Sequence, residues 1–181
     1  MSSLRIFSQD NPKAAIQEST NKKEMANLLK DAGVRYEQWP TPASLSEQPE
    51  QDEILQAYKK EIDSLMQSEG YQTVDAISLS SDHPQKDDFR KKFLDEHTHS
   101  EDEVRFFVKG QGLFTLHIED NVYEVLCTQG DLISVPANTP HWFDMGPNPN
   151  FIAIRLFNNE EGWVANFTGS NIAQSFNRLE N

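Results

Sequence analysis

The sequence predicts a mainly β protein, a small β-barrel with a few peripheral helices on its N-terminal side. From about Val74 onward, short segments rich in β-branched and aromatic residues are separated by Gly, Asn or Asp turns. Strands of this length and spacing are typical of a sandwich or a small barrel. We therefore expect one domain over residues 1–181, in which N-terminal helical and strand elements (1–73) pack on a barrel and C-terminal segment (74–181).

Helices are predicted mainly in the first part of the chain. In TNKKEMANLLKDAG, Met25, Leu28 and Leu29 share one face, and Gly33 suits a helix C-terminus. A longer helix is expected over roughly 51–69, where the apolar residues form one stripe. The polar segment TPASLSEQPEQDE reads as a loop leading into it, and DDFRKKFLDE as one further short helix.

The predicted strands follow one another closely in the second part of the chain. They alternate with turn residues, whereas the tail after GWVANFTG has no clear pattern. In chain order they are VDAISL, VRFFV, LFTLHIE, VYEVLC, DLISV and FIAIRLF.

Composition limits the partners and the compartment. A net charge of −13 and a pI near 4.7 argue against nucleic acid or an anionic membrane surface as a partner. The N-terminus does not resemble a signal peptide, and no apolar stretch reaches ~18 residues. The single cysteine, Cys127, fits a reducing compartment and is expected to be a buried apolar residue. We therefore expect a cytoplasmic protein.

Two histidines and a glutamate lie close together in the segment DEHTHSEDEVRFFVKGQG. Side chains of an extended segment alternate between faces, so residues of equal parity point the same way. His97, His99 and Glu103 share this parity with Arg105 and Phe107. All five are expected to face the barrel interior if the intervening turn keeps the register.

A third histidine follows in GDLISVPANTPHWF. The strand after Gly130 ends in a turn that delivers His141, with Phe143 on the same face. Three imidazoles and a carboxylate from neighbouring strands can converge on one metal ion. The remaining histidines, His83 and His117, are expected to be surface or hydrogen-bonded residues.

The two segments have the spacings H-x-H-x3-E-x6-G and G-x5-P-x-N-x2-H. A His-x-His pair alone is weak evidence, but together the segments resemble the paired motifs of the cupin superfamily. The resemblance implies a double-stranded β-helix, or jelly roll, that binds a divalent metal through His97, His99, Glu103 and His141. These donors leave two positions free on an octahedral ion, which suits Fe(II), Ni(II), Mn(II) or Co(II) better than closed structural zinc.

Arg105 is the most informative neighbour of these residues. An arginine facing a barrel interior is costly without an anionic partner, because it keeps its proton. A divalent ion with Glu103 and Arg105 leaves two positive charges, which a substrate dianion would neutralise. The alternative is an ion pair between Arg105 and Asp102 or Glu101.

Other neighbours suggest weaker roles. Glu96 and Asp102 lie on the opposite parity, as candidates for hydrogen bonds to the ligand imidazoles or for gathering the cation, or else as solvated groups. Phe93, Phe143 and Trp163 are predicted to wall the substrate pocket, although aromatic residues are more often part of the core.

Four segments together are similar to the bacterial acireductone dioxygenase family, and the resemblance covers most of the chain. The core E-H-x-H-x-x-D-E-x-R, with the later NNEEGW, is far more specific than the general cupin motifs. The four are GVRYEQWP, EHTHSEDEVRFFVKGQGLF, GDLISVPANTPHWFDMG and IRLFNNEEGWVANFTG.

This resemblance implies a monomeric enzyme of methionine salvage with one Fe(II) or Ni(II) per chain. Its substrates would be O2 and 1,2-dihydroxy-3-keto-5-methylthiopentene, the acireductone, with Arg105 favouring the substrate dianion. The Fe(II) form would give formate and 2-keto-4-methylthiobutyrate. The Ni(II) form would give formate, carbon monoxide and 3-methylthiopropionate.

Two alternatives remain open from the residues. A metal-dependent sugar isomerase on the same barrel would need polar groups for hydroxyls or a phosphate, and the sequence offers aromatics instead. A non-enzymatic ligand-binding cupin would show no substrate-dependent O2 uptake.

Overall fold

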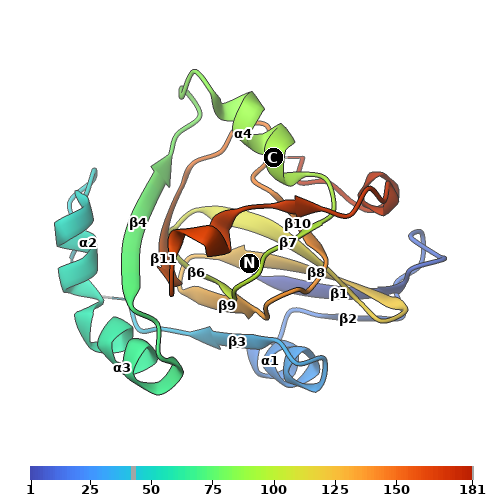
Figure 1. Ribbon diagram of the computed structural model, residues 1–181, viewed down its shortest axis with the longest axis horizontal. Helices are drawn as coiled ribbons and strands as arrows, with labels where there is room; N and C mark the ends of the chain where they lie inside the picture. Colours follow the sequence, from blue (N-terminus) through green and yellow to red (C-terminus); the bar gives the residue numbers. More distant parts are fainter. Residues whose placement is uncertain (42–43, 181) are drawn as a thin grey trace.

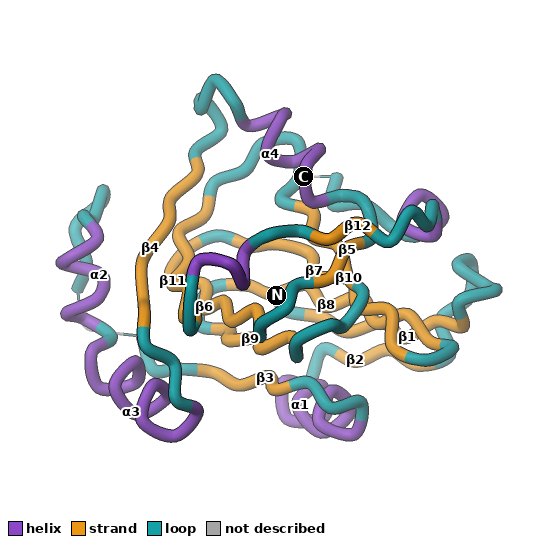
Figure 2. Tube along the Cα trace, viewed as in Figure 1, coloured by secondary structure: helices purple, strands orange, loops and turns teal. Residues whose placement is uncertain are grey.

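The computed structural model describes residues 1–41 and 44–180, and its strands form two antiparallel sheets (Figure 1, Figure 2). Pro42 and Ala43 of the predicted loop lie outside the described residues. One sheet has the order β12 (Asn166–Phe167), β5 (His97–Thr98), β10 (His141–Asp144), β7 (Gln111–Ile118), β8 (Asn121–Thr128), β1 (Ser3–Ser8) and β2 (Gln17–Ser19). The other has the order β3 (Arg35–Gln38), β9 (Asp131–Val135), β6 (Glu103–Lys109), β11 (Phe151–Phe157) and β4 (Thr73–Leu79).

The helices of the described residues surround these sheets. The amide side chain of Asn21 caps the first helix by accepting from the backbone N–H groups of Lys23 and Glu24. No helix in the described ranges is long and apolar enough to cross a membrane. Figure 1 shows α2 and α3 beside β4, and α4 at the top of the view. The helices are α1 (Lys22–Asp31), α2 (Gln51–Ala57), α3 (Lys59–Glu69), α4 (Lys86–Phe93) and the short 3-10 turns η1 (Glu160–Trp163) and η2 (Ile172–Ser175).

The predicted helix over 51–69 is instead two helices that meet at Tyr58. The backbone of Tyr58 leaves the helical region, with φ −106° and ψ 16°. Its ring is buried, with its centroid 6.4 Å from that of Trp39 and 4.8 Å from that of Phe106. Packing against the sheet therefore overrides the continuous apolar stripe.

Three strands before residue 74, which the sequence pattern did not locate, extend both sheets. Strand β1 pairs with β8 over its whole length, β2 pairs with β1, and β3 pairs with β9. The six strands predicted after residue 74 and the helix at α4 are confirmed. The N-terminal part therefore contributes to the sheets as well as covering them.

The five-stranded sheet separates two hydrophobic layers. Along β6, Phe107 belongs to a cluster drawn from both sheets, whereas Phe106 belongs to a cluster shared with α2 and α3. This alternation is the period of two that a strand imposes. The even-numbered side of β6 thus supports the outer helices, and the odd-numbered side faces the space between the sheets.

Candidate metal centre

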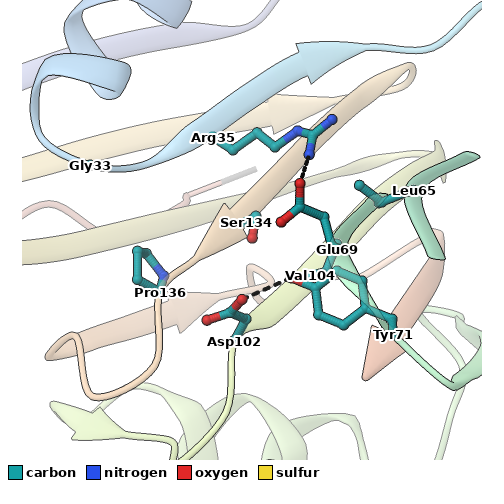
Figure 3. Close-up of a pocket in the computed structure, with 9 residues that line it drawn as sticks. All are labelled: Gly33, Arg35, Leu65, Glu69, Tyr71, Asp102, Val104, Ser134 and Pro136. Carbon is teal, nitrogen blue, oxygen red and sulfur yellow. Dashed lines mark hydrogen bonds and ion pairs between the residues drawn. The ribbon is translucent and has the colours of Figure 1, made fainter. Parts of the chain in front are cut away.

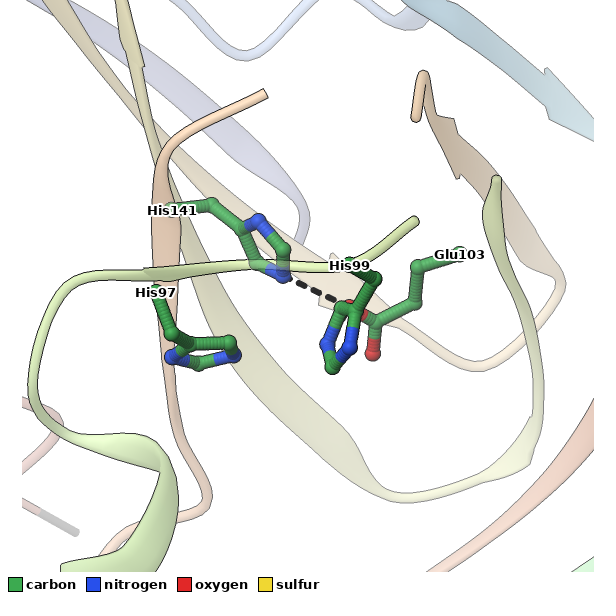
Figure 4. A group of neighbouring side chains, drawn as sticks. All are labelled: His97, His99, Glu103 and His141. Atoms are coloured by element: carbon green, nitrogen blue, oxygen red, sulfur yellow. Dashed lines mark hydrogen bonds and ion pairs between the residues drawn. The ribbon is translucent and has the colours of Figure 1, made fainter. Parts of the chain in front are cut away.

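Four side chains converge in the space between the sheets (Figure 4). One ligand atom from each of His97, His99, Glu103 and His141 lies within 4.8 Å of the others. The Nε2 atoms of His141 and His99 lie 2.6 Å and 3.2 Å from Oε2 of Glu103. The three imidazoles are almost entirely buried. These are the four residues that the sequence predicts as metal ligands.

Strand pairing brings these residues together from separate segments. His141 is the first residue of β10, and it lies directly opposite His97 of β5. The turn before β10 is fixed by Asn138, whose φ of 63° is left-handed and whose backbone N–H donates to the carbonyl of His99. Asparagine tolerates this conformation better than most residues. The turn and the His99 segment are therefore held in contact.

Backbone carbonyls orient all three rings. Nδ1 of His97 lies 2.7 Å from the carbonyl oxygen of Asp95, and Nδ1 of His141 lies 2.8 Å from that of Thr139. Nδ1 of His99 lies 3.0 Å from the carbonyl oxygen of Val164. A carbonyl only accepts, so each Nδ1 carries the proton and Nε2 is the nitrogen available to a metal.

The pKa values of the cluster favour a neutral His97 and an ionised Glu103, which are the forms that bind a cation. Burial, followed by the charge of His141, lowers the pKa of His97 to about 4. Burial raises the pKa of Glu103, but Arg105 and the contacts with His141 and His99 lower it more, so this pKa lies well below its ordinary range. Burial lowers the pKa of His141, but Glu103 reverses this and raises it. The 2.6 Å contact between Nε2 of His141 and Oε2 of Glu103 thus joins two of the atoms that a cation would bind.

Arg105 adds a fixed positive charge beside this cluster. Its Nη2 lies 3.0 Å from Oε1 of Glu103, and its other hydrogen bond is a long one, 3.4 Å, to the carbonyl of Val104. The alternative partners, Asp102 and Glu101, bind other groups. Arg105 is therefore paired with Glu103, a candidate metal ligand whose negative charge would also attract a bound cation.

A cavity of about 420 Å³ opens beside the cluster. His97, Glu103 and Arg105 line one part of it. Its remaining wall is mostly apolar and includes the predicted pocket residues Phe93 and Phe143. Other rings in the wall are Phe89, Phe107, Phe114 and Phe151. A small molecule with a polar head and an apolar tail fits this distribution.

Comparison with known proteins places this geometry in a family. The ARD/ARD' family model matches residues 3–165. The chain belongs to this family. It is 66% identical over 178 residues to the acireductone dioxygenase of Alcanivorax borkumensis, with 98% of each chain covered. It is 58% identical over 180 residues to that of Pseudomonas fluorescens, with 99% of each covered.

A solved structure of the ARD/ARD' family shares the fold. The acireductone dioxygenase from Bacillus anthracis, solved with a cadmium ion in its active centre, has a TM-score of 0.78 and 34% identity. The similarity covers 92% of this chain and 98% of that one. The predicted cupin-type, mainly β fold is thereby confirmed.

Glu96 makes no hydrogen bond to a ligand imidazole in the described residues, so that one of its predicted roles has no support here. Glu96 is buried and accepts from Nδ1 of His117 at 2.7 Å and from the hydroxyl of Thr168 at 2.8 Å. Glu96 immediately precedes β5, and its carboxylate contacts His117 of β7 and Thr168 rather than a ligand imidazole. His117 is the hydrogen-bonded histidine that the sequence predicts.

Asp102 also binds no ligand imidazole in the described residues; it ties the site to the rest of the fold (Figure 3). It accepts from the hydroxyl of Tyr71 at 2.8 Å and from the backbone N–H of Ala137 at 2.9 Å. Ala137 lies in the turn that leads to His141. Asp102 therefore links that turn to Glu103, the next residue along the chain.

Trp163 was predicted to wall the pocket, but it is not among the residues that line the cavity. Its ring centroid lies 3.7 Å from the guanidinium carbon of Arg155 and 4.0 Å from the ring of Phe157. Arg155 itself lines the cavity and was missed, because FIAIRLF reads as an apolar strand. Its parity with the inward-facing Ala153 was the available signal.

Proposed function

We propose that this chain is a metal-dependent dioxygenase that cleaves an acireductone with O2. The observation that carries the proposal is one cavity that opens beside the three-imidazole, one-carboxylate cluster and is lined by His97 and Glu103 of that cluster, by Arg105 and by a mostly apolar wall. The substrate proposed is 1,2-dihydroxy-3-keto-5-methylthiopentene, and the pathway is methionine salvage. Membership of the ARD/ARD' family and the names of the relatives support this assignment.

The ligands proposed for the metal are His97, His99, Glu103 and His141. Each imidazole is held through Nδ1, so its Nε2 is turned toward the cluster, and the pKa of Glu103 lies well below its ordinary range, so the donors fit a divalent cation. When bound, the ion would hold two adjacent oxygens of the ene-diolate and balance their charge. We propose Fe(II) or Ni(II), one per chain.

The other residues of the cavity would act on the substrate directly. Arg105 would stabilise the doubly deprotonated form, because a fixed cation in a water-poor cavity interacts strongly with developing negative charge. Phe93 and Phe143 would cover the methylthio tail and exclude water from the polar head. The wall also contains Ser78, His83 and Lys92, but most of its other residues are apolar, which favours a methylthio tail over the several hydroxyls of a sugar.

The decisive experiment loads metal-free protein separately with Fe(II) and Ni(II) and supplies an acireductone under measured O2. We expect O2 consumption with both metals. The Fe(II) form should yield formate and 2-keto-4-methylthiobutyrate, and the Ni(II) form formate, carbon monoxide and 3-methylthiopropionate. Metal-loaded protein that consumes no O2 with this substrate would contradict the proposal and favour a binding cupin.

The variant Arg105→Ala separates metal binding from turnover. It should keep the metal, since Arg105 is no ligand, and lose activity. Unchanged turnover would remove Arg105 from the mechanism but leave the reaction itself in place. We also propose that the protein is a cytoplasmic monomer whose partners are small molecules only, which sedimentation of the metal-loaded protein and cell fractionation would test.

A further inference from the structure

We propose that Arg155 is a second anion-binding residue of the cavity and acts beside Arg105 on the substrate dianion. The inference rests on the proposed function, which it deepens by adding a residue that recognises the substrate's charge. Arg155 lines the same cavity as His97, Glu103 and Arg105. It comes from a different strand, β11, and from the later part of the sequence.

Strand register places three charged residues in one row across the five-stranded sheet. On β11, Arg155 lies opposite Asp75 of β4 on one side and opposite Arg105 of β6 on the other. Residues directly opposite each other on antiparallel strands point to the same face. Glu103, two residues before Arg105 on β6, lies on that face as well.

The two arginines in this row are neighbours of like charge, an arrangement that destabilises a sheet unless something compensates for it. Two ion pairs do so here. Arg155 donates to both carboxylate oxygens of Asp75, at 2.9 Å and 2.6 Å, and Arg105 pairs with Glu103. Asp75 is not among the residues that line the cavity, whereas both arginines are. The cavity wall is thus more positive than the neutral row as a whole.

Arg155 also has a donor to spare. Its Nε and Nη2 atoms bind Asp75, and Nη1 has no hydrogen-bond partner among the described residues. A guanidinium has five N–H donors in a fixed fork, so two remain on Nη1. The Asp75 contact thereby holds the group in place without using all its capacity for an oxygen ligand.

The NNEEGW segment supports the same guanidinium from another direction. Trp163 stacks on Arg155 with a cation–π distance of 3.7 Å. The segment is docked on Glu101, which accepts from the side-chain amides of Asn158 and Asn159 and lies so near Gly162 that an added Cβ would come within 2.7 Å of its Cβ. Arg155 is therefore held rigidly, as a preorganised ligand-binding group requires.

Charge balance is consistent with a dianionic ligand. Asp75, Arg155, Arg105 and Glu103 sum to no net charge, so a divalent cation at the cluster leaves two positive charges. A dianion with two adjacent oxygens restores neutrality. With Arg105 engaged by Glu103, the free Nη1 of Arg155 is a second source of the hydrogen bonds such a ligand needs.

The test uses oxalate, a small chelating dianion, and Ni(II)-loaded protein without O2. Three variants are compared with the wild type by calorimetric titration: Arg155→Met, Asp75→Asn, and the double variant with both changes. Arg155→Met and the double variant should bind oxalate roughly tenfold to a hundredfold more weakly, the range of one charge-assisted hydrogen bond. Asp75→Asn should bind oxalate as tightly as the wild type or tighter, because the amide oxygen still accepts a hydrogen bond from Arg155 while the competing negative charge is gone.

The expected difference in oxalate affinity between Arg155→Met and Asp75→Asn distinguishes an anion-binding role from a structural one. If the pair were only structural, Asp75→Asn and Arg155→Met would be equally harmful, and that result would overturn the inference. So would a double variant that binds oxalate normally. Nickel content and melting temperature of each variant show whether the fold and the metal are retained, and the double variant, which leaves no unpaired charge, guards against misfolding of Arg155→Met.

Oxalate binding also separates this inference from the proposed function. A wild type that turns over the acireductone while Arg155→Met keeps its oxalate affinity and KM refutes the role of Arg155 alone. A wild type that binds oxalate through Arg155 but never consumes O2 with the acireductone refutes the proposed reaction and leaves the anion site standing.

Discussion

The two faces of the five-stranded sheet have different roles: one lines the cavity, and the other packs against α2 and α3. Between the sheets, β6 presents Glu103, Arg105 and Phe107 to the cavity. On the outer face, the same strand presents Val104, Phe106 and Val108 to a mainly apolar and aromatic layer under α2 and α3. Each face uses alternate residues, so one seven-residue strand serves both the site and the core.

The difference shows how a polar site is kept in place. The inner face contains buried charges, which cost free energy to desolvate. On the outer face the ion pairs of Arg35 with Glu37 and Glu69 stay partly exposed, and the buried layer packs Trp39 against Phe106 with a centroid distance of 4.6 Å. Apolar burial in the outer layer therefore offsets the free-energy cost of burying charges on the inner face. Substitutions on the two faces should separate stability from metal and substrate binding.

The largest expected effect is the loss of stability in Phe106→Ala. Phe106 is fully buried against Trp39 and Tyr58, so its removal leaves a cavity in the outer layer and should lower the free energy of unfolding by roughly 3–5 kcal/mol. Chemical denaturation of the metal-free protein measures this. Metal content at low temperature should stay normal.

Its neighbour on the other face provides the control. Phe107→Ala removes the same ring but enlarges an existing cavity, so it should raise the KM for the substrate. An altered KM in Phe106→Ala with little loss of stability would show that the two faces are not separable.

The fold was predictable wherever the spacing of apolar residues has the period of a strand or of a helix. The strand at FIAIRLF, buried at nearly every residue, and the short helix at DDFRKKFLDE are both found as expected. The predicted single helix was wrong at Tyr58, where it divides into two, because that division depends on packing against residues far away in the sequence. Strand β2 has only three residues, too few for any alternation to be recognised.

The site was predictable in its ligands and less so in their surroundings. Parity and spacing made His97, His99, Glu103 and His141 candidates that can converge, and the resemblance to the cupin motifs identified them as the expected ligand set. The groups that orient the rings are backbone carbonyls, which every residue has and which therefore leave no mark in the sequence. The position of Trp163 depends on a 3-10 turn rather than on a strand, so strand parity could not assign its side.

An intermediate effect is expected for His97→Ala, which acts on the inner layer alone. Four-ligand zinc sites bind with apparent energies of ~10–16 kcal/mol, so losing one of four donors should cost roughly 3 kcal/mol, a loss of metal affinity on the order of 100-fold. Competition with a coloured chelator gives this value. Burial lowers the pKa of His97 to about 4, so its ring is neutral at pH 7 and the variant removes no charge from the metal-free cluster. A variant with wild-type metal affinity would remove His97 from the ligand set.

The smallest expected effect comes from Tyr71→Phe, at the place where the two layers are joined. Tyr71 belongs to the outer layer, yet its hydroxyl donates to Asp102, which also accepts from the turn before His141 (Figure 3). Removing the hydroxyl deletes one hydrogen bond, worth about 1 kcal/mol, and loosens Asp102 beside Glu103. Metal affinity should therefore fall by roughly tenfold, the lower end of the range for groups that support metal ligands.

Tyr58→Phe is the matched control for this substitution. It removes the same hydroxyl from the same layer, but Tyr58 makes no hydrogen bond to Asp102 in the described residues. Its metal affinity should equal that of the wild type. If both variants bind metal normally, the outer layer supports the fold but does not position the site, and the link through Asp102 has no effect on the ligands. If both bind metal equally weakly, the effect comes from general loosening of the outer layer and not from the Tyr71–Asp102 contact.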